Sequence, residues 1–152
     1  MKRILLTQGQ YAIVDDEDLE RISHWKWHFG GGYARRGNYP SWRLIYMHRE
    51  VLNVPSHLDC DHINGNRLDN RKINLRVCTH AQNTKNRKLS RNNRSGFKGV
   101  HWRERDKKWS ASIGIEKRRM YLGYFETREE AATSYNNAAK VLHGEFANLN
   151  KI

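Results

Sequence analysis

The stretch LDCDHINGNRLDNRKINLRVCTHAQNTKN, residues 58–86, carries polar side chains at spacings that a plain hydrophobic core does not need. Asp61 and His62 are adjacent on a segment that we expect to be extended, so their side chains point to opposite sides unless the backbone bends. Residues 64–66, Asn-Gly-Asn, are typical of a tight turn. The stretch therefore predicts a strand that enters a turn with a carboxylate and an imidazole at its end.

The second half of this stretch predicts the return of the chain. We expect residues 71–77 to run back along the first strand with Asn74 opposite it, and residues 80–87 to form a short helix that carries Asn83. Each side chain alone is weak evidence, because a lone Asp-His pair is usually a surface pair and an isolated Asn is usually a turn residue or cap. Their order along one hairpin and helix is the informative feature.

The charge of the chain indicates a polyanionic partner. The net charge is +12, and residues 1–90 hold 15 Lys or Arg against 9 Asp or Glu while residues 91–152 hold 13 against 7, so each part carries +6. Lys and Arg near phosphates release condensed counterions, which drives binding to nucleic acid. A solvated basic surface or a ribosome-associated protein is the alternative interpretation of charge alone.

The composition, 38% hydrophobic and 29% charged residues, is typical of a folding sequence. The apolar run at residues 4–6 is too short for a signal peptide or a membrane span, so we expect a cytoplasmic protein. Cys60 and Cys78 lack the CxxC spacing of structural zinc and are expected to be reduced thiols. A zinc site with His57 and His80 is the alternative.

The N-terminal third predicts short elements. We expect a strand pair at 3–6 and 11–14, and then a helix that is capped at residues 15–18 and continues to about Trp27. The Gly30-Gly31-Gly32 run breaks this helix. Two extended segments follow at 33–36 and 42–46, and residues 48–52 turn toward a second helix.

Residues 84–95 have the composition of a basic linker, and a different pattern follows. Extended runs at 97–102, 108–115 and 119–125 predict a three-stranded antiparallel sheet. Thr127 and Glu130 form a capping-box pattern, and the apolar residues after it have helical spacing up to Gly144. We expect this helix to pack across one face of the sheet and to leave the other face for a partner.

The first 90 residues resemble the HNH endonucleases, particularly phage and intron-encoded homing enzymes. The resemblance is carried by MHR at 47–49, DHINGN at 61–66, LDNR at 68–71, NLR at 74–76 and QNTKN at 82–86. It implies a ββα-metal (His-Me finger) nuclease domain whose core covers about 58–88. The third letter of the family name is occupied here by Asn83, a variant that many relatives share.

The resemblance also implies roles for four residues. Asp61 and Asn83 would hold one divalent cation per active site, and His62 would face water beside it as the general base. Asn74 would fix the loop and the orientation of His62, and is counted with His62 as catalytic. Oxygen ligands suit Mg²⁺ or Mn²⁺ better than zinc. His48 is expected to be structural.

Residues 96–152 resemble the DNA-binding domains of the apetala-two/ethylene-response-factor type, through SGFKGVHW at 95–102, KWSASI at 108–113 and YLGYF at 121–125. This family inserts its sheet into the major groove. The resemblance implies that the following residues contact DNA: Lys98, His101, Arg103, Arg105, Trp109, Arg119 and Tyr121. Trp109 is the one most easily explained as a core residue instead.

Together these observations predict an α+β protein with a nuclease domain (1–90), a linker (91–95) and an apetala-two-like domain (96–152). We expect a metal-dependent endonuclease of the homing type that cuts double-stranded DNA and does not bind a membrane. A single nuclease centre in each chain favours a monomer that nicks, unless the chain dimerises. The alternatives are a DNA-binding regulator with a remnant HNH unit, and an RNA-directed or ribosome-associated basic protein.

Overall fold

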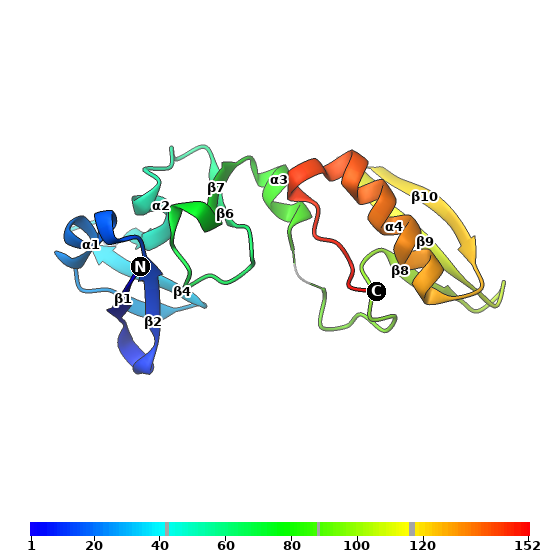
Figure 1. The fold of residues 1–152 in the computed structure, drawn as a ribbon, viewed down its shortest axis with the longest axis horizontal. Coiled ribbons are helices and arrows are strands. Elements are labelled where there is room, and N and C mark those ends of the chain that lie inside the picture. The colour runs from blue at the N-terminus through cyan, green and yellow to red at the C-terminus, as the bar shows by residue number, and fades with distance from the viewer. Residues whose placement is uncertain (42, 88, 116–117) are drawn as a thin grey trace. The chain divides into compact units, whose positions relative to one another are not determined.

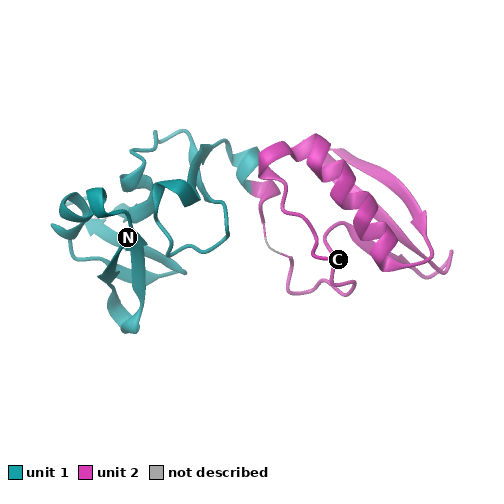
Figure 2. Cartoon of the chain, in the orientation of Figure 1, with its two compact units in different colours: residues 1–83 teal, residues 84–152 magenta. Residues whose placement is uncertain are grey.

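The structure is a computed structural model that describes residues 1–41, 43–87, 89–115 and 118–152. The predicted strand start at residue 42 and parts of two turns, at 88 and 116–117, lie outside the described residues. The chain consists of two compact units, Met1–Asn83 and Thr84–Ile152 (Figure 2). This division falls inside a helix, before the stretch 91–95 that the sequence suggests as a linker.

The first unit is built from short strands and helices (Figure 1). In chain order they are β1 (Lys2–Leu5), η1 (Thr7–Gly9), β2 (Tyr11–Val14), α1 (Asp16–Ser23), β3 (His28–Gly30), β4 (Tyr33–Asn38), β5 (Arg43–Tyr46), α2 (Met47–Val51), β6 (Asp59–His62), η2 (Lys72–Asn74), β7 (Leu75–Cys78) and α3 (His80–Lys85).

Three antiparallel sheets form this unit, with strand orders β1-β2, β3-β4-β5 and β6-β7. Their inner faces and α1 and α2 enclose one hydrophobic core, in which Ile22 and Met47 are fully buried. Burial of such side chains contributes about 1.5–3 kcal/mol each. Cys60 and Leu75 belong to the same core, so the hairpin β6-β7 is anchored to it directly.

The helix at the N-terminal end is shorter than the prediction. α1 ends at Ser23, where the sequence predicts a helix to about Trp27, and the strand β3 takes up the residues just before the glycine run. Trp27 is 5% exposed, and its indole nitrogen donates to the carbonyl of Ile22 at 2.8 Å. This side-chain contact folds the chain back after the helix, which residue spacing alone does not reveal.

The second unit holds β8 (Val100–Arg103), β9 (Lys108–Ile115), β10 (Arg118–Phe125), α4 (Arg128–His143) and η3 (Gly144–Phe146). The strands form an antiparallel sheet in the order β10-β9-β8, and α4 lies across it in Figure 1. Val100, Ala111 and Ile113 are buried on the sheet side, and Ala131, Ala132, Tyr135 and Ala139 on the helix side.

The start and end of α4 agree with the sequence prediction. The hydroxyl of Thr127 accepts from the amide of Glu130 at 3.2 Å, and the carboxylate of Glu130 accepts from the amide of Thr127 at 3.2 Å. The predicted capping box is therefore confirmed. Gly144 follows the helix with φ of 54°, a left-handed value that favours glycine.

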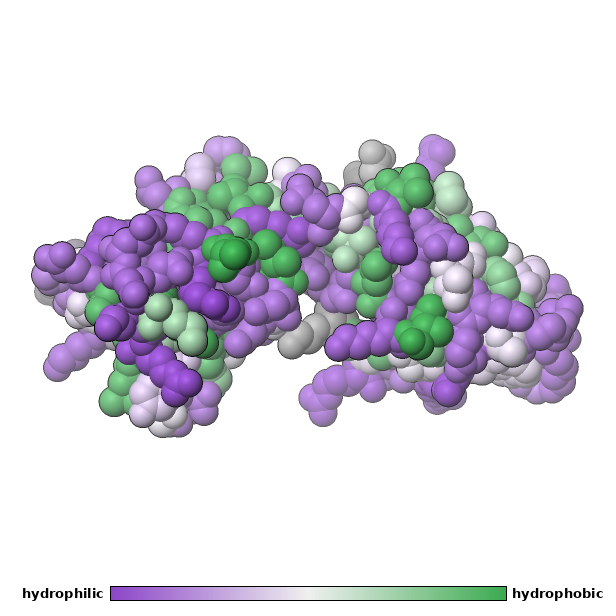
Figure 3. All heavy atoms as spheres, viewed as in Figure 1, coloured by the Kyte–Doolittle hydropathy of each residue, from purple (hydrophilic) through white to green (hydrophobic). Residues whose placement is uncertain are grey.

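Polar side chains dominate the exposed surface. Figure 3 shows hydrophilic residues over most of the visible face, with hydrophobic ones in separate small groups. Within the described parts of the chain, no helix combines the length and the hydropathy that crossing a bilayer requires.

Candidate functional site

The hairpin β6-β7 sorts the candidate residues onto two faces. Asp61 pairs with Arg76 and His62 pairs with Leu75 in the strand register. Because side chains alternate along a strand, Asp59 shares the face of Asp61, whereas Cys60 and His62 lie on the face toward the core. The sequence expectation that Asp61 and His62 point to opposite sides follows from the same alternation.

Asp61 is bound to an arginine from the neighbouring strand. Its Oδ2 accepts from Arg76 Nε at 3.0 Å and from Arg76 Nη2 at 2.7 Å, and the residue is 6% exposed. An arginine that donates two hydrogen bonds to one carboxylate fixes its position. The pair therefore holds the carboxylate of Asp61 at a fixed place on the hairpin.

Asn83 lies on α3 and reaches the same face of the hairpin. Its Nδ2 donates to Asp59 Oδ2 at 3.0 Å, and His80 Nδ1 lies 3.0 Å from the same oxygen. The hydrogen bond from Asn83, with a smaller contribution from His80, lowers the pKa of Asp59 below its usual value. The sequence prediction missed Asp59, although its position two residues before Asp61 on a strand was the available signal.

His62 lies inside a ring cluster and not on the surface. The residue is 5% exposed, and its ring centroid is 4.9 Å from that of His48 and 6.1 Å from that of Tyr33. The expectation that this imidazole faces water is therefore wrong for the free protein, because aromatic neighbours cover it. Burial lowers the pKa of His62, and the hydrogen bond with Asn70 offsets part of that effect.

Asn70 fixes the orientation of His62. His62 Nε2 lies 3.2 Å from Asn70 Oδ1, and Asn70 Nδ2 donates to the carbonyl of Leu68 at 3.2 Å and to Met47 Sδ at 3.5 Å. Because the amide nitrogen is engaged there, the amide oxygen faces the imidazole and can accept a hydrogen bond from Nε2.

Asn70 was not among the predicted site residues, although it lies in the motif at 68–71. It is fully buried, and its backbone amide donates to the carbonyl of Ile13 at 2.8 Å. The spacing of residues along the sequence does not reveal that Ile13, in the N-terminal hairpin, contacts Asn70. Its role therefore depends on tertiary contacts that the sequence does not display.

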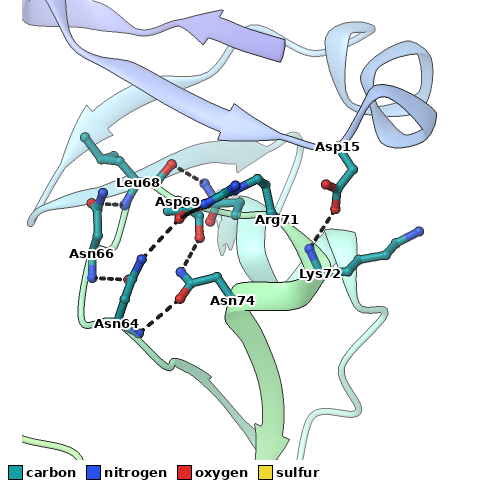
Figure 4. Close-up of polar contacts among 9 residues, drawn as sticks. Asp15, Asn64, Asn66, Leu68, Asp69, Arg71, Lys72 and Asn74 are labelled. Atoms are coloured by element: carbon teal, nitrogen blue, oxygen red, sulfur yellow. Dashed lines mark hydrogen bonds and ion pairs between the residues drawn. The ribbon is translucent and has the colours of Figure 1, made fainter. Parts of the chain in front are cut away.

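Asn74 ties the loop between β6 and β7 (Figure 4). Its Oδ1 accepts from the amide of Asn64 at 3.0 Å, and its Nδ2 donates to the carbonyl of Asp69 at 2.8 Å. The carboxylate of Asp69 in turn accepts from both sides, from Asn64 Nδ2 at 3.1 Å and from Arg71 Nε at 2.7 Å. Asn74 contacts no atom of His62 in these bonds and acts through the loop.

The two cysteines lie on the strands β6 and β7. Among the described residues, no group of three or more His, Cys, Asp and Glu is placed to hold a metal ion. Cys60 and Cys78 are buried free thiols, and burial raises the pKa of Cys60 to about 12 and that of Cys78 to about 11. Burial of this kind disfavours the thiolate form that a zinc ligand takes.

Most of the residues predicted to contact DNA lie on one side of the second unit. The strand register places His101, Arg103, Arg119 and Tyr121 on the sheet face away from α4, and Tyr121 is 70% exposed. The Arg103 guanidinium lies 5.5 Å from the ring centroid of Tyr124 on this face. The result is an exposed surface of cations and rings.

Three of the predicted DNA contacts have other surroundings. Trp109 is partly buried on the face toward α4, 5.2 Å from the ring of Trp102, as its interpretation as a core residue expects, and its contact with DNA stays a prediction. Lys98 Nζ donates to the carbonyl of Lys85 at 3.0 Å. Arg105 is in the turn between β8 and β9, where its Nε donates to Asp106 at 3.1 Å.

Comparison with known proteins defines the class. The HNH endonuclease family matches residues 52–85. An HNH endonuclease of Acanthamoeba polyphaga mimivirus is 34% identical over 149 residues, which are 95% of this chain and 77% of that protein. Protein 3.8 of Escherichia phage T7 is 31% identical over 62% of this chain and 77% of its own length. This chain belongs to the HNH endonuclease family, whose members are nucleases.

The C-terminal region has different relatives. An ethylene-responsive transcription factor of Medicago truncatula is 38% identical over 87 residues, which are 56% of this chain and 32% of that protein. A dehydration-responsive element-binding protein of Arabidopsis thaliana is 44% identical over 61 residues. The chain therefore joins similarity to a nuclease family with similarity to plant transcription factors.

Proposed function

We propose that this protein is a metal-dependent endonuclease that hydrolyses phosphodiester bonds of double-stranded DNA. The observation that carries the proposal is the bond between His62 and Asn70, which fixes the orientation of an imidazole whose pKa is lowered by burial. A neutral imidazole accepts a proton from water near pH 7. The lowered pKa of His62 keeps this form populated.

Asp61 and Asn83 are the residues that would hold the cation. A carboxylate and an amide oxygen suit Mg²⁺ or Mn²⁺. Asn83 Nδ2 donates a hydrogen bond to Asp59, so Asn83 Oδ1 is the atom of this side chain that would bind the cation. The two groups fit this role because Asp59, which holds Asn83, shares a strand face with Asp61.

Arg76 is the competitor of such a cation. It binds Oδ2 of Asp61, and it would have to share that carboxylate when a metal is present. A bound cation would offset the negative charge that develops on the phosphate and on the departing oxygen. Asn74 and Asn70 hold the loop and the imidazole, so the geometry of His62 is set before DNA arrives.

The second unit would read DNA through the sheet face away from α4. We assign to this interface His101, Arg103, Arg119 and Tyr121 of the sheet face and Arg105 of the turn between β8 and β9. Lys98 and Trp109 stay predicted contacts outside this face. Arginine binds phosphate and guanine through two nitrogens, and a β-sheet fits the major groove. One centre in each chain favours a nicking enzyme of the homing type, with the chain acting as a monomer.

Supercoiled plasmid tests the proposal. Wild-type protein with Mg²⁺ or Mn²⁺ should convert it to the nicked circle, and His62→Ala should abolish this conversion while DNA binding in a gel shift is retained. His57→Ala is the matched control, because His57 is an exposed histidine in the same unit and should cut normally. Intact plasmid with wild-type protein that still binds DNA would favour the non-catalytic regulator instead.

A further inference from the structure

The sheet β3-β4-β5 has a second face that the hydrophobic core does not use. Ala34 and Ile45 point to the core, so the alternation of side chains places Tyr33, Arg35 and Tyr46 on the opposite face. Tyr33 and Tyr46 meet there at 5.4 Å between ring centroids. This face is therefore aromatic and basic.

Two guanidinium groups lie at the hairpin between β3 and β4. The Arg67 guanidinium is 4.6 Å from the ring centroid of Tyr33, and its Nη1 donates to the carbonyl of Gly31 at 3.4 Å. The Arg35 guanidinium lies over Gly30, where a β-carbon would come within 2.2 Å of its Nε. Gly30 pairs with Tyr33 in the strand register, so both cations flank one tyrosine.

Neither cation has a carboxylate partner among the described residues. Other arginines of this unit are paired, such as Arg36 with Glu50 and Arg71 with Asp69, at 3.1 and 2.7 Å. Arg35 Nε is buried without a hydrogen-bond partner. A buried donor without an acceptor costs free energy, which a ligand with an acceptor atom would recover.

Arg67 is connected to the proposed catalytic base through Tyr33, and Arg35 lies beside the same tyrosine. Tyr33, on which Arg67 stacks, is a neighbour of His62 at 6.1 Å and of His48 at 5.3 Å between ring centroids. The ring of Tyr33 therefore lies between the basic patch of Arg35 and Arg67 and the imidazole of His62, and no acidic group takes part in these ring contacts. A strand whose scissile bond lies at His62 would pass next to this patch.

We propose that Arg35 and Arg67 bind backbone phosphates of the DNA strand on one side of the scissile bond. A guanidinium fork matches two phosphate oxygens, and its flat face stacks on an aromatic ring at the same time. The patch is distinct from the sheet of the second unit and contributes affinity without reading sequence. Its position beside the scissile bond rests on the nuclease function proposed above.

The salt dependence of binding tests this patch in the full-length chain. Arg67→Ala and Arg35→Ala should each lower the slope of log K against log salt by about 0.9, because one phosphate contact is lost. Single-turnover cleavage should slow on the order of 10-fold or more, because the strand is less well positioned. Arg67→Gln provides a second variant of similar length, with the same expected change in slope.

Arg43→Ala is the matched control. Arg43 is an exposed arginine of β5 on the opposite face of the same sheet, and its loss should change neither the slope nor the cleavage rate. Wild-type slopes for both Arg35→Ala and Arg67→Ala would overturn the proposal, even if the variants melted at lower temperature. The slope of log K against log salt is a property of binding and does not depend on cleavage. A wild-type protein that binds DNA but does not cut it would therefore reject the nuclease function and leave the phosphate contacts to be judged from the slopes.

Discussion

The imidazole of His62 is held by one amide, which fixes the orientation of the ring. Asn70 supplies the acceptor for Nε2, while Leu68 and Met47 hold the amide in place. A buried group of this kind acts on the reaction through the orientation of its neighbour. Asn70 is thus a positioning residue of the proposed site.

Replacement of Asn70 should slow cleavage without weakening DNA binding. In Asn70→Ala the imidazole loses its acceptor, and we expect single-turnover cleavage to fall about 10- to 100-fold. Asn70→Asp retains an acceptor oxygen and should recover much of that loss, which a purely structural role would not predict. Asn66→Ala, an exposed asparagine of the same loop, is the control. Cleavage by Asn70→Ala at the wild-type rate would contradict the assignment.

His48 should make the protein sensitive to mild acid. Burial lowers its pKa from 6.5 to about 3, so below pH 6.5 the unfolded chain binds a proton that the folded chain does not. Stability is then fully present above pH 6.5 and falls as the pH drops, by up to about 1.4 kcal/mol per pH unit. Between pH 6.5 and 5 the lowered pKa values of Asp59 and Asp69 contribute little, since those carboxyls stay ionised.

Thermal unfolding over this pH range measures the effect. His48→Gln should show a smaller fall in melting temperature between pH 6.5 and 5 than the wild type, with a remaining slope from His62. His24→Gln changes an exposed histidine of the same unit and should leave the wild-type slope. Identical slopes for His48→Gln and wild type would show that His48 is not held neutral by burial.

Elements whose limits depend on local chemistry were predictable from the sequence. The capping box of α4 uses two residues three positions apart, and the strand at 108–115 shows in its alternation. The end of α1 was predicted four residues too late, because the indole of Trp27 binds back to Ile22 across a turn. Periodicity records which side chains are apolar and says nothing about such a contact.

The same distinction applies to the candidate site. Asp61, His62, Asn74 and Asn83 were proposed because their stretch resembles the HNH endonucleases, and their assigned roles stay predictions. Asn70 escaped because its partners come from β2 and from the start of α2, far away in the sequence. The burial of His62 escaped for the same reason, since Tyr33 and His48 supply its cover.

The whole chain combines two basic modules. The first unit carries the proposed chemistry and the phosphate contacts of Arg35 and Arg67, and the second unit carries the proposed sheet interface. If the second unit supplies binding alone, its loss should raise the protein concentration needed for cleavage and leave the maximal rate intact. Similarity to two unrelated groups of proteins in one chain is consistent with such a division.

The double variant Arg119→Ala/Tyr121→Ala removes a cation and a ring from the exposed sheet face. We expect DNA affinity to fall by about 5- to 150-fold, corresponding to ~1–3 kcal/mol, while cleavage at saturating protein stays at the wild-type rate. Lys140→Ala/Val141→Ala removes an exposed cation and an exposed apolar side chain from α4 and should change neither quantity. A parallel fall in the saturated rate would mean that the sheet also places the strand at His62. Unchanged affinity would instead leave the nuclease unit as the source of DNA binding.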